Sequence, residues 1–198
     1  MPHSSKLIRS SSPSSASSLS SIRMVTFTPI DGGIRVESST ATFDVFPKKV
    51  SKDIWTLQSH PEETLENKKL VSWPGEYDFQ SVTMRAIGQE QGKQVSFSAV
   101  SDGIRMAFID APILDWSDAD IEKLGDIDVL VLAGDNPKKI TPLIESVDPR
   151  VIILFETKDG DLAGSAKACG QSSVTPVGEF KVKPSTLPQD SRQVIVLG

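Results

Sequence analysis

Side chains that could bind a catalytic metal are scarce in this chain of 198 residues. It contains two histidines, His3 and His60, and a single cysteine, Cys169. A catalytic zinc ion usually takes three protein ligands, mostly His with some Asp, Glu or Cys. His3 lies in a polar N-terminal tail, so the folded part offers one histidine, in the segment Ser59-His60-Pro61-Glu62-Glu63-Thr64. An ordinary zinc centre is therefore not expected.

Nucleophilic chemistry without a metal has little support either. Cys169 precedes Gly170 near the end of a predicted helix, and no histidine near it in the sequence could act as its base. We interpret it as a structural thiol. The chain has no G-x-S-x-G nucleophile elbow and no phosphate-binding P-loop.

The composition of the chain limits the classes of partner that we expect for it. Charged residues make up 24% and the formal net charge is -5, whereas nucleic-acid-binding domains are usually basic. No apolar run approaches the roughly 20 residues of a membrane helix. One cysteine excludes an internal disulfide framework and is compatible with a reducing compartment. We expect a cytoplasmic protein that binds neither nucleic acid nor membrane, with a protein or small-molecule partner of unknown identity and an unknown oligomeric state.

The first 23 residues differ from the rest of the chain. They are rich in Ser, contain no acidic residue and have too little apolar surface to offset the entropy of folding. We expect a disordered tail over residues 1–23 and one domain over residues 24–198. The alternatives are a start at Met24 and an organelle transit peptide, which is also Ser- and Arg-rich. The tail lacks the apolar core of a secretory signal.

From Met24 onward, short runs of β-type residues separated by turn residues predict strands first and alternating helices and strands later. Asp115 or Ser117 can begin a helix that Gly125 ends. Pro74-Gly75-Glu76 is interpreted as a tight turn. The predicted strands are 25–30, 34–37, 40–46, 54–57, 69–72, 81–87, 94–100, 104–109, 128–133, 150–155, 179–183 and 193–197, and the further helices are 137–147 and 161–168. This order predicts an α/β domain with mixed sheets.

Four segments occur in the same order as motifs of a known family. Val71 to Phe79 resembles an "S-G-P-G-E-Y-E" segment, and Asp102 to Asp110 resembles a "D-G-x-R-I-x-H-L-G-D" strand. Leu124 to Leu130 is similar to "L-G-x-V-D-V-L", and Val147 to Ile153 is similar to the start of "E-P-x-I-V-I-P-M-H". Together they resemble the small metallo-β-lactamase-fold hydrolases close to L-ascorbate-6-phosphate lactonase, over residues 24–198. The resemblance implies an αββα sandwich of two mixed sheets flanked by helices, with a metal site at one sheet edge.

The resemblance also implies that most metal ligands are missing. The family's first ligand cluster is H-x-H-x-D-H, which places His60 on the first histidine, Glu62 on the second, Thr64 on the aspartate and Leu65 on the last histidine. Asp110 keeps the family's bridging aspartate, whereas Glu156 stands at the final "M-H" position, where the family has a histidine. A fifth segment, residues 30–33, maps loosely onto "L-G-H-S" without its histidine.

Two functions remain open at this point. The first is a non-catalytic binding or structural module that keeps the scaffold without the dinuclear zinc site and needs no cofactor. The second is a re-purposed hydrolase of phosphoesters, lactones or esters that holds one divalent cation, Mn²⁺, Mg²⁺ or Zn²⁺, on His60, Glu62, Asp110 and Glu156. An oxygen-rich ligand set suits Mg²⁺, Mn²⁺ or Ca²⁺ better than zinc. We expect the first, because the loss of donors at positions 64 and 65 removes what two-metal hydrolysis requires.

Overall fold

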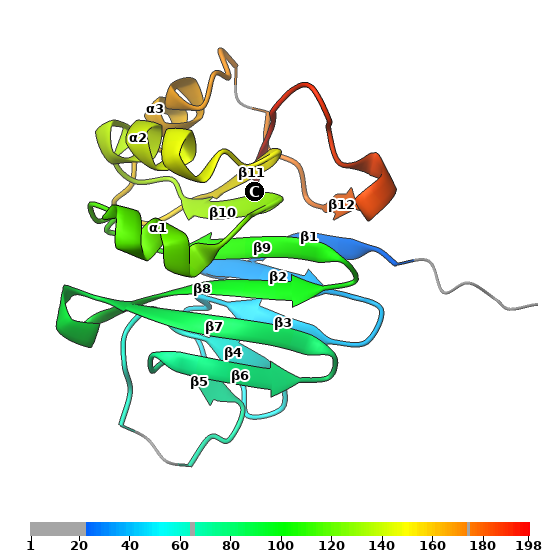
Figure 1. The fold of residues 1–198 in the computed structure, drawn as a ribbon, viewed down its shortest axis with the longest axis vertical. Helices are drawn as coiled ribbons and strands as arrows, with labels where there is room; N and C mark the ends of the chain where they lie inside the picture. Colours follow the sequence, from blue (N-terminus) through cyan, green and yellow to red (C-terminus); the bar gives the residue numbers. More distant parts are fainter. Residues whose placement is uncertain (1–22, 64–65, 174) are drawn as a thin grey trace, which may run out of the picture.

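Two mixed β-sheets form the body of the molecule in the computed structural model, which describes residues 23–63, 66–173 and 175–198 (Figure 1). Of the predicted tail over residues 1–23, residues 1–22 lie outside the described residues. The chain builds the first sheet from its N-terminal strands and one late strand, and the second sheet from everything between them together with its last strand.

The first sheet has six strands in the order β12-β1-β2-β3-β4-β5. Strands β12, β1, β2 and β3 pair antiparallel, and β3, β4 and β5 pair parallel. Their bounds are β1 Val25–Ile30, β2 Gly33–Glu37, β3 Thr42–Val45, β4 Trp55–Leu57, β5 Leu70–Val71 and β12 Phe180–Val182.

The second sheet has seven strands in the order β13-β11-β10-β9-β8-β7-β6. Strands β13, β11, β10 and β9 run parallel, and β9, β8, β7 and β6 pair antiparallel. Their bounds are β6 Gly75–Phe79, β7 Val82–Gln89, β8 Gln94–Ser101, β9 Ile104–Ile109, β10 Val129–Ala133, β11 Val151–Phe155 and β13 Gln193–Leu197.

Burial follows the position of each strand. In β7, the buried Val82 and Met84 alternate with the exposed Thr83 and Arg85. In contrast, β10 and β11 are buried along their whole lengths, as is usual for parallel strands covered on both faces. Between the sheets, Phe43 of β3 packs edge-on against Phe79 at 5.9 Å and Phe108 at 6.0 Å between ring centroids.

Three α-helices pack against the seven-stranded sheet: α1 Asp118–Leu124, α2 Pro137–Val147 and α3 Leu162–Ala168 (Figure 1). Their apolar residues, such as Leu124, Ile140 and Ala166, form a second core with side chains of β7, β9, β10, β11 and β13. Short 3₁₀ turns lie at Glu90–Gly92 and Pro184–Thr186. The predicted strands and helices are thus confirmed in kind and order, with ends that shift by a few residues.

Two local predictions were wrong. The segment predicted as a tight turn at Pro74-Gly75-Glu76 leads into β6, whose hairpin with β7 turns at Gln80 and Ser81 instead. Glu76, Tyr77, Asp78 and Phe79 do alternate between exposed and inward positions, but the run is short and directly follows the turn residues Pro74 and Gly75. The helix predicted over 137–147 requires Pro142 to lie near its start, where a proline is tolerated, but Pro142 lies inside α2.

The expected sandwich of two mixed sheets is confirmed, but in the described residues the α-helices pack on one sheet alone. A row of polar side chains across the outward face of the six-stranded sheet explains this. Register places Thr28 beside Arg35, Arg35 beside Asp44, and Asp44 beside Thr56. Arg35 donates to both oxygens of Asp44, at 2.8 and 3.0 Å. Such a polar row presents no apolar stripe for a helix to cover.

None of the helices in the described ranges has the length and apolar content required to span a membrane.

Arg105 stabilises the connection between α1 and β10. Its backbone and guanidinium groups donate three hydrogen bonds to the buried Asp128, at 2.8 to 3.0 Å. Burial alone would raise the pKa of Asp128, but the hydrogen bonds and charge of Arg105 outweigh burial and lower that pKa. The stabilisation is therefore present above the unfolded pKa, about 3.9, and is lost as pH falls through the lower folded pKa.

We predict that Arg105→Met lowers the free energy of unfolding by about 2 kcal/mol at pH 7, because Asp128 keeps a buried charge without its partner. The loss should shrink toward pH 3, as measured by urea unfolding. Lys181→Met is the matched control, because Lys181 pairs with Glu179 at the surface with both side chains 49% exposed. Its effect should stay below about 0.5 kcal/mol. Equal losses in both variants would contradict the prediction.

Candidate functional site

A cleft of about 660 Å³ opens where the parallel strands of the second sheet end. The register aligns Ile109 with Leu132, and Phe155 with both Ala133 and Leu197. The residues that follow these strands therefore meet at one edge, as ligand sites do in α/β sheets. The cleft is also bounded by the turn between β1 and β2 and by the segment after β3.

The cleft combines apolar walls with charged groups. Pro29, Ile30, Phe46, Phe155 and Leu197 form the apolar part. The charged lining residues come from four separate segments, and they are Asp31, Lys48, Asp110, Glu156 and Lys158. Asp31 and Lys48 approach each other to 3.9 Å, whereas Glu156 and Lys158 are exposed.

Asp110 is the most enclosed of the cleft carboxylates. Its Oδ1 accepts from the backbone N–H of Ala111 at 2.8 Å, and its Oδ2 accepts from the hydroxyl of Ser59 at 2.6 Å. Burial raises the pKa of Asp110, assisted by the negative charge of Asp135, while the bonds from Ser59 and Ala111 and the charge of His60 act in the opposite direction. The net effect is a raised pKa, so ionising Asp110 costs free energy in the folded protein.

Ser59 connects Asp110 to His60. The Ser59 hydroxyl lies 3.0 Å from Nδ1 of His60, and Ser59 itself is 1% exposed. The backbone carbonyl of Ser59 accepts from the N–H of Val95 at 2.7 Å, which ties the loop to β8. His60 is exposed and does not line the cleft in the described part of the chain. Ser59 is too buried to act as a nucleophile, so it orients its neighbours.

Phe46 has a backbone conformation that is unusual for a bulky side chain. Its φ is 54°, in the left-handed region, which costs about 1 to 3 kcal/mol and persists only where the surroundings enforce it. The N–H of Phe46 donates to the carbonyl of Leu57 at 2.9 Å, and its ring packs against Phe97 and Phe155 at 6.0 and 6.3 Å between centroids. Strain of this kind is concentrated at ligand clamps and other functional sites.

Gly33 makes this bend possible. A Cβ at Gly33 would lie 2.1 Å from the carbonyl oxygen of Val45 and 2.7 Å from that of Phe46. Only glycine permits so close an approach of β2 to the end of β3. Residues 30–33, the segment that maps onto "L-G-H-S", therefore lie on the cleft wall. There Gly33 permits the close approach of the two backbones.

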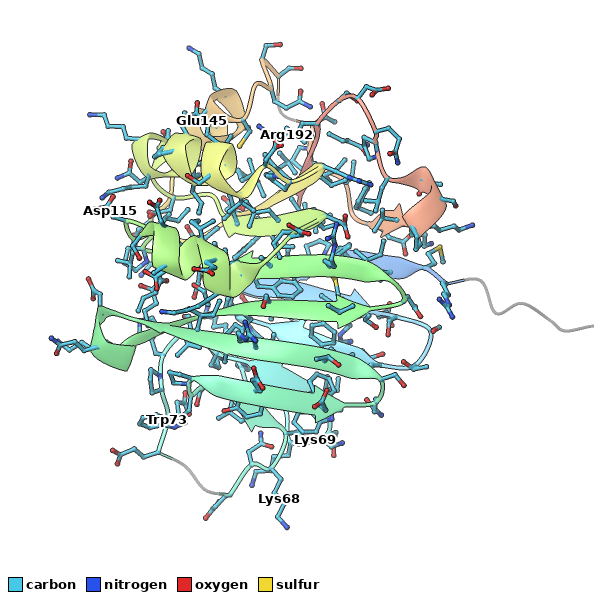
Figure 2. The ribbon with its side chains drawn as sticks, in the orientation of Figure 1. Lys68, Lys69, Trp73, Asp115, Glu145 and Arg192 are labelled. Atoms are coloured by element: carbon cyan, nitrogen blue, oxygen red, sulfur yellow. The ribbon has the colours of Figure 1, made fainter. Side chains whose placement is uncertain are left out.

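The remaining positions of the expected ligand loop point to another part of the surface. The N–H of Glu62 donates to Ser72 Oγ at 3.1 Å, and the carbonyl of Glu62 accepts from the indole of Trp73 at 3.0 Å. These bonds tie Glu62 to the connection between β5 and β6, where Trp73 lies at the surface (Figure 2). Thr64 and Leu65 lie outside the described residues.

Cys169 lies at the end of α3, half-buried against the helix core. Burial raises the pKa of the Cys169 thiol to about 11, so it carries almost no thiolate near neutral pH. This agrees with its interpretation as a structural thiol.

No family model matches the sequence, and no curated protein matches it significantly. Solved structures do. A proposed Zn-dependent hydrolase of the metallo-β-lactamase superfamily from Thermotoga maritima superposes with a TM-score of 0.66 at 18% identity, over 88% of this chain and 100% of that one. A proposed metal-dependent hydrolase from Parabacteroides distasonis gives 0.55 at 12%, over 87% and 92%. The metallo-β-lactamase fold protein YhfI from Bacillus subtilis gives 0.57 at 9%, over 88% and 96%. The chain therefore has the metallo-β-lactamase fold.

The donors present do not fit the metal centre that this fold implies. Within the described ranges, no three His, Cys, Asp or Glu side chains gather into a group that could hold a metal ion. Of the four candidate ligands, Asp110 and Glu156 share the cleft, His60 reaches Asp110 through Ser59, and Glu62 is tied to the other loop.

Several residues of the site were not predicted as functional, among them Ser59, Phe46, Lys48 and Lys158. Ser59 immediately precedes His60, but a serine in a loop is too common to indicate a hydrogen bond to a distant aspartate. Phe46 precedes Pro47, which restricts its backbone, yet the positive φ depends on contacts with β2 and β4. Lys48 carries no local pattern.

We predict that Asp110→Asn raises the melting temperature at pH 7. A raised folded pKa means that stability is fully present below the unfolded pKa of about 3.9 and is lost as pH rises through the folded pKa. The neutral amide of the variant removes that loss. The gain in melting temperature over the parent protein should therefore vanish toward about pH 3.5, as measured by thermal unfolding followed by circular dichroism. Glu156→Gln, an exposed carboxylate in the same cleft, should change the melting temperature little. A lower melting temperature for Asp110→Asn at pH 7 would contradict the prediction.

Proposed function

We propose that this chain is a non-catalytic relative of the small lactonase-like metallo-β-lactamase-fold hydrolases, and that it binds a small amphiphilic molecule in the cleft. The main observation in favour is the backbone of Phe46, whose φ of 54° costs about 1 to 3 kcal/mol and sets its ring beside Phe155 at the cleft. It shapes a wall of phenylalanine rings beside charged groups. Function resides in such sites and not in the fold.

The chemistry of the ligand follows from the lining. An apolar ring or chain would pack against Phe46 and Phe155, which is how most ligand pockets gain affinity. Hydroxyl or amino groups would donate to Asp110 and Glu156, and an anionic group would pair with Lys48 or Lys158. We propose that this ligand binding needs no cofactor and takes place in the cytoplasm.

An anionic aromatic dye tests the cleft before its natural ligand is known. Anilinonaphthalene sulfonate has an apolar ring system and one negative charge, so it should bind with increased fluorescence. Lys158→Glu should weaken this binding at least threefold, because the exposed Lys158 borders the cleft. The charge-matched control Lys138→Glu, exposed at the start of α2, should leave the affinity unchanged. Equal affinities in both variants would exclude the cleft as the binding site.

The second candidate is a metal-dependent hydrolase that uses His60, Glu62, Asp110 and Glu156. It is favoured by one observation: Asp110 and Glu156 line the same cleft at the ends of parallel strands, where cation ligands commonly meet.

Metal binding separates the two candidates. A cation that binds only the folded state, at a free concentration about 100 times its dissociation constant, stabilises that state by about 2.7 kcal/mol. This stabilisation raises the melting temperature of a domain of this size by roughly 5 to 10 °C. We predict no such shift with Mn²⁺ or Zn²⁺, and no stoichiometric metal in protein purified without chelator. Bound metal with a shift that His60→Ala abolishes would instead establish the hydrolase.

A further inference from the structure

We propose that Ser59 and Asp110 fix the tautomer of His60, and that the exposed imidazole thereby presents its Nε2 atom as a preset hydrogen-bond acceptor. The inference concerns the surface beside the cleft and is independent of the ligand proposed for the cleft itself. It assigns Ser59 as a positioning residue and His60 as a recognition residue for a ligand that carries an N–H or O–H donor.

A serine hydroxyl carries one proton and can therefore donate one hydrogen bond, although it can accept others. An ionised carboxylate can only accept. The distance of 2.6 Å between Ser59 Oγ and Asp110 Oδ2 is that of a charge-assisted O–H···O⁻ bond. The single proton of Ser59 is therefore used by Asp110.

The direction of the second bond follows. Ser59 Oγ lies 3.0 Å from Nδ1 of His60 and has no proton left to donate to it. The bond forms only if Nδ1 carries the proton and donates to Ser59. A neutral imidazole has one N–H, so Nε2 then carries the lone pair.

The surroundings hold this arrangement in place. Ser59 is 1% exposed, so water does not compete for its hydroxyl. Its carbonyl is bound by Val95, and Asp110 is fixed from the other side by the N–H of Ala111. His60 itself is exposed, which leaves Nε2 accessible to a donor from outside. Preset polar groups of this kind add specificity because no reorganisation is required on binding.

Nitrogen NMR measures the tautomer directly, with neither ligand nor metal present. The full-length ¹⁵N-labelled protein would carry His3→Gln, so that all imidazole signals come from His60. Spectra recorded with chelator at an alkaline pH, where the imidazole shifts no longer change with pH, report the tautomer of the ring. We expect a protonated Nδ1 and a bare Nε2, identified by their well-separated ¹⁵N shifts and their couplings to the ring protons.

Asp110→Asn should reverse the chain of bonds. The amide oxygen would accept from Ala111, and the amide N–H would donate to Ser59. Ser59 would then donate to Nδ1 of His60, so the proton should move to Nε2 and the two ¹⁵N shifts should exchange. Ser59→Ala removes the partner of Nδ1, so Nε2–H should rise from a minor to a substantial share.

Glu156→Gln is the matched control, because it neutralises a carboxylate of the same cleft outside the chain of bonds; it should leave the His60 shifts unchanged. Amide spectra verify that each variant folds. A predominant Nε2–H tautomer in the parent protein would overturn the proposal, as would an unchanged tautomer in both folded variants. Asp110→Asn and Ser59→Ala act at different points, so one that fails to fold leaves the other as the test.

Discussion

The alignment of four parallel strands is the constraint on which the candidate site depends. Strands β10 and β11 are buried along their whole lengths between β9 and β13, and the register of all four strands is fixed over consecutive pairs. Because parallel strands of equal register end together, Asp110 and Glu156 emerge at the same edge of the sheet, although they lie 46 positions apart in the chain. Close packing maintains this edge: the N–H of Gly134 donates to the carbonyl of Phe155 at 2.8 Å, and a Cβ at Gly160 would lie 1.9 Å from the oxygen of Gly134, an overlap no side chain could relieve.

The sequence was sufficient for much of this framework. Continuous apolar runs at 129–133 and 151–155 predict strands buried on both faces, and the residues after them are then expected at a common edge. The alternation in 82–87 predicts a strand with one face outward. The weak point was β6, where exposed Glu76 and Asp78 alternate with inward Tyr77 and Phe79 over four residues only, directly after Pro74-Gly75. So short a run beside a turn signal was interpreted as a turn.

The site was harder to predict than the fold because its interactions join distant segments. Comparison of motif positions identified Asp110 and His60, but it treated both as metal ligands. The hydroxyl between them comes from Ser59, 51 positions from Asp110 in the chain, and no pattern of spacing indicates such a bond. The positive φ of Phe46 likewise depends on Gly33 and Leu57, which belong to the neighbouring strands of its sheet. Local sequence determines the elements, whereas contacts between elements determine the site.

Most of the residues that stabilise this fold differ from those that line its cleft. The strands of this molecule are stabilised by an apolar layer that includes Phe43, Phe97 and Phe108, and none of these requires a metal. Asp110, in contrast, weakens the fold when ionised, because burial raises its pKa. A buried carboxylate with that cost, joined through a hydroxyl to an exposed imidazole, is not explained by stability alone. It is explained if the cleft edge is selected for recognition, with Asp110 setting the donor and acceptor pattern that a ligand encounters.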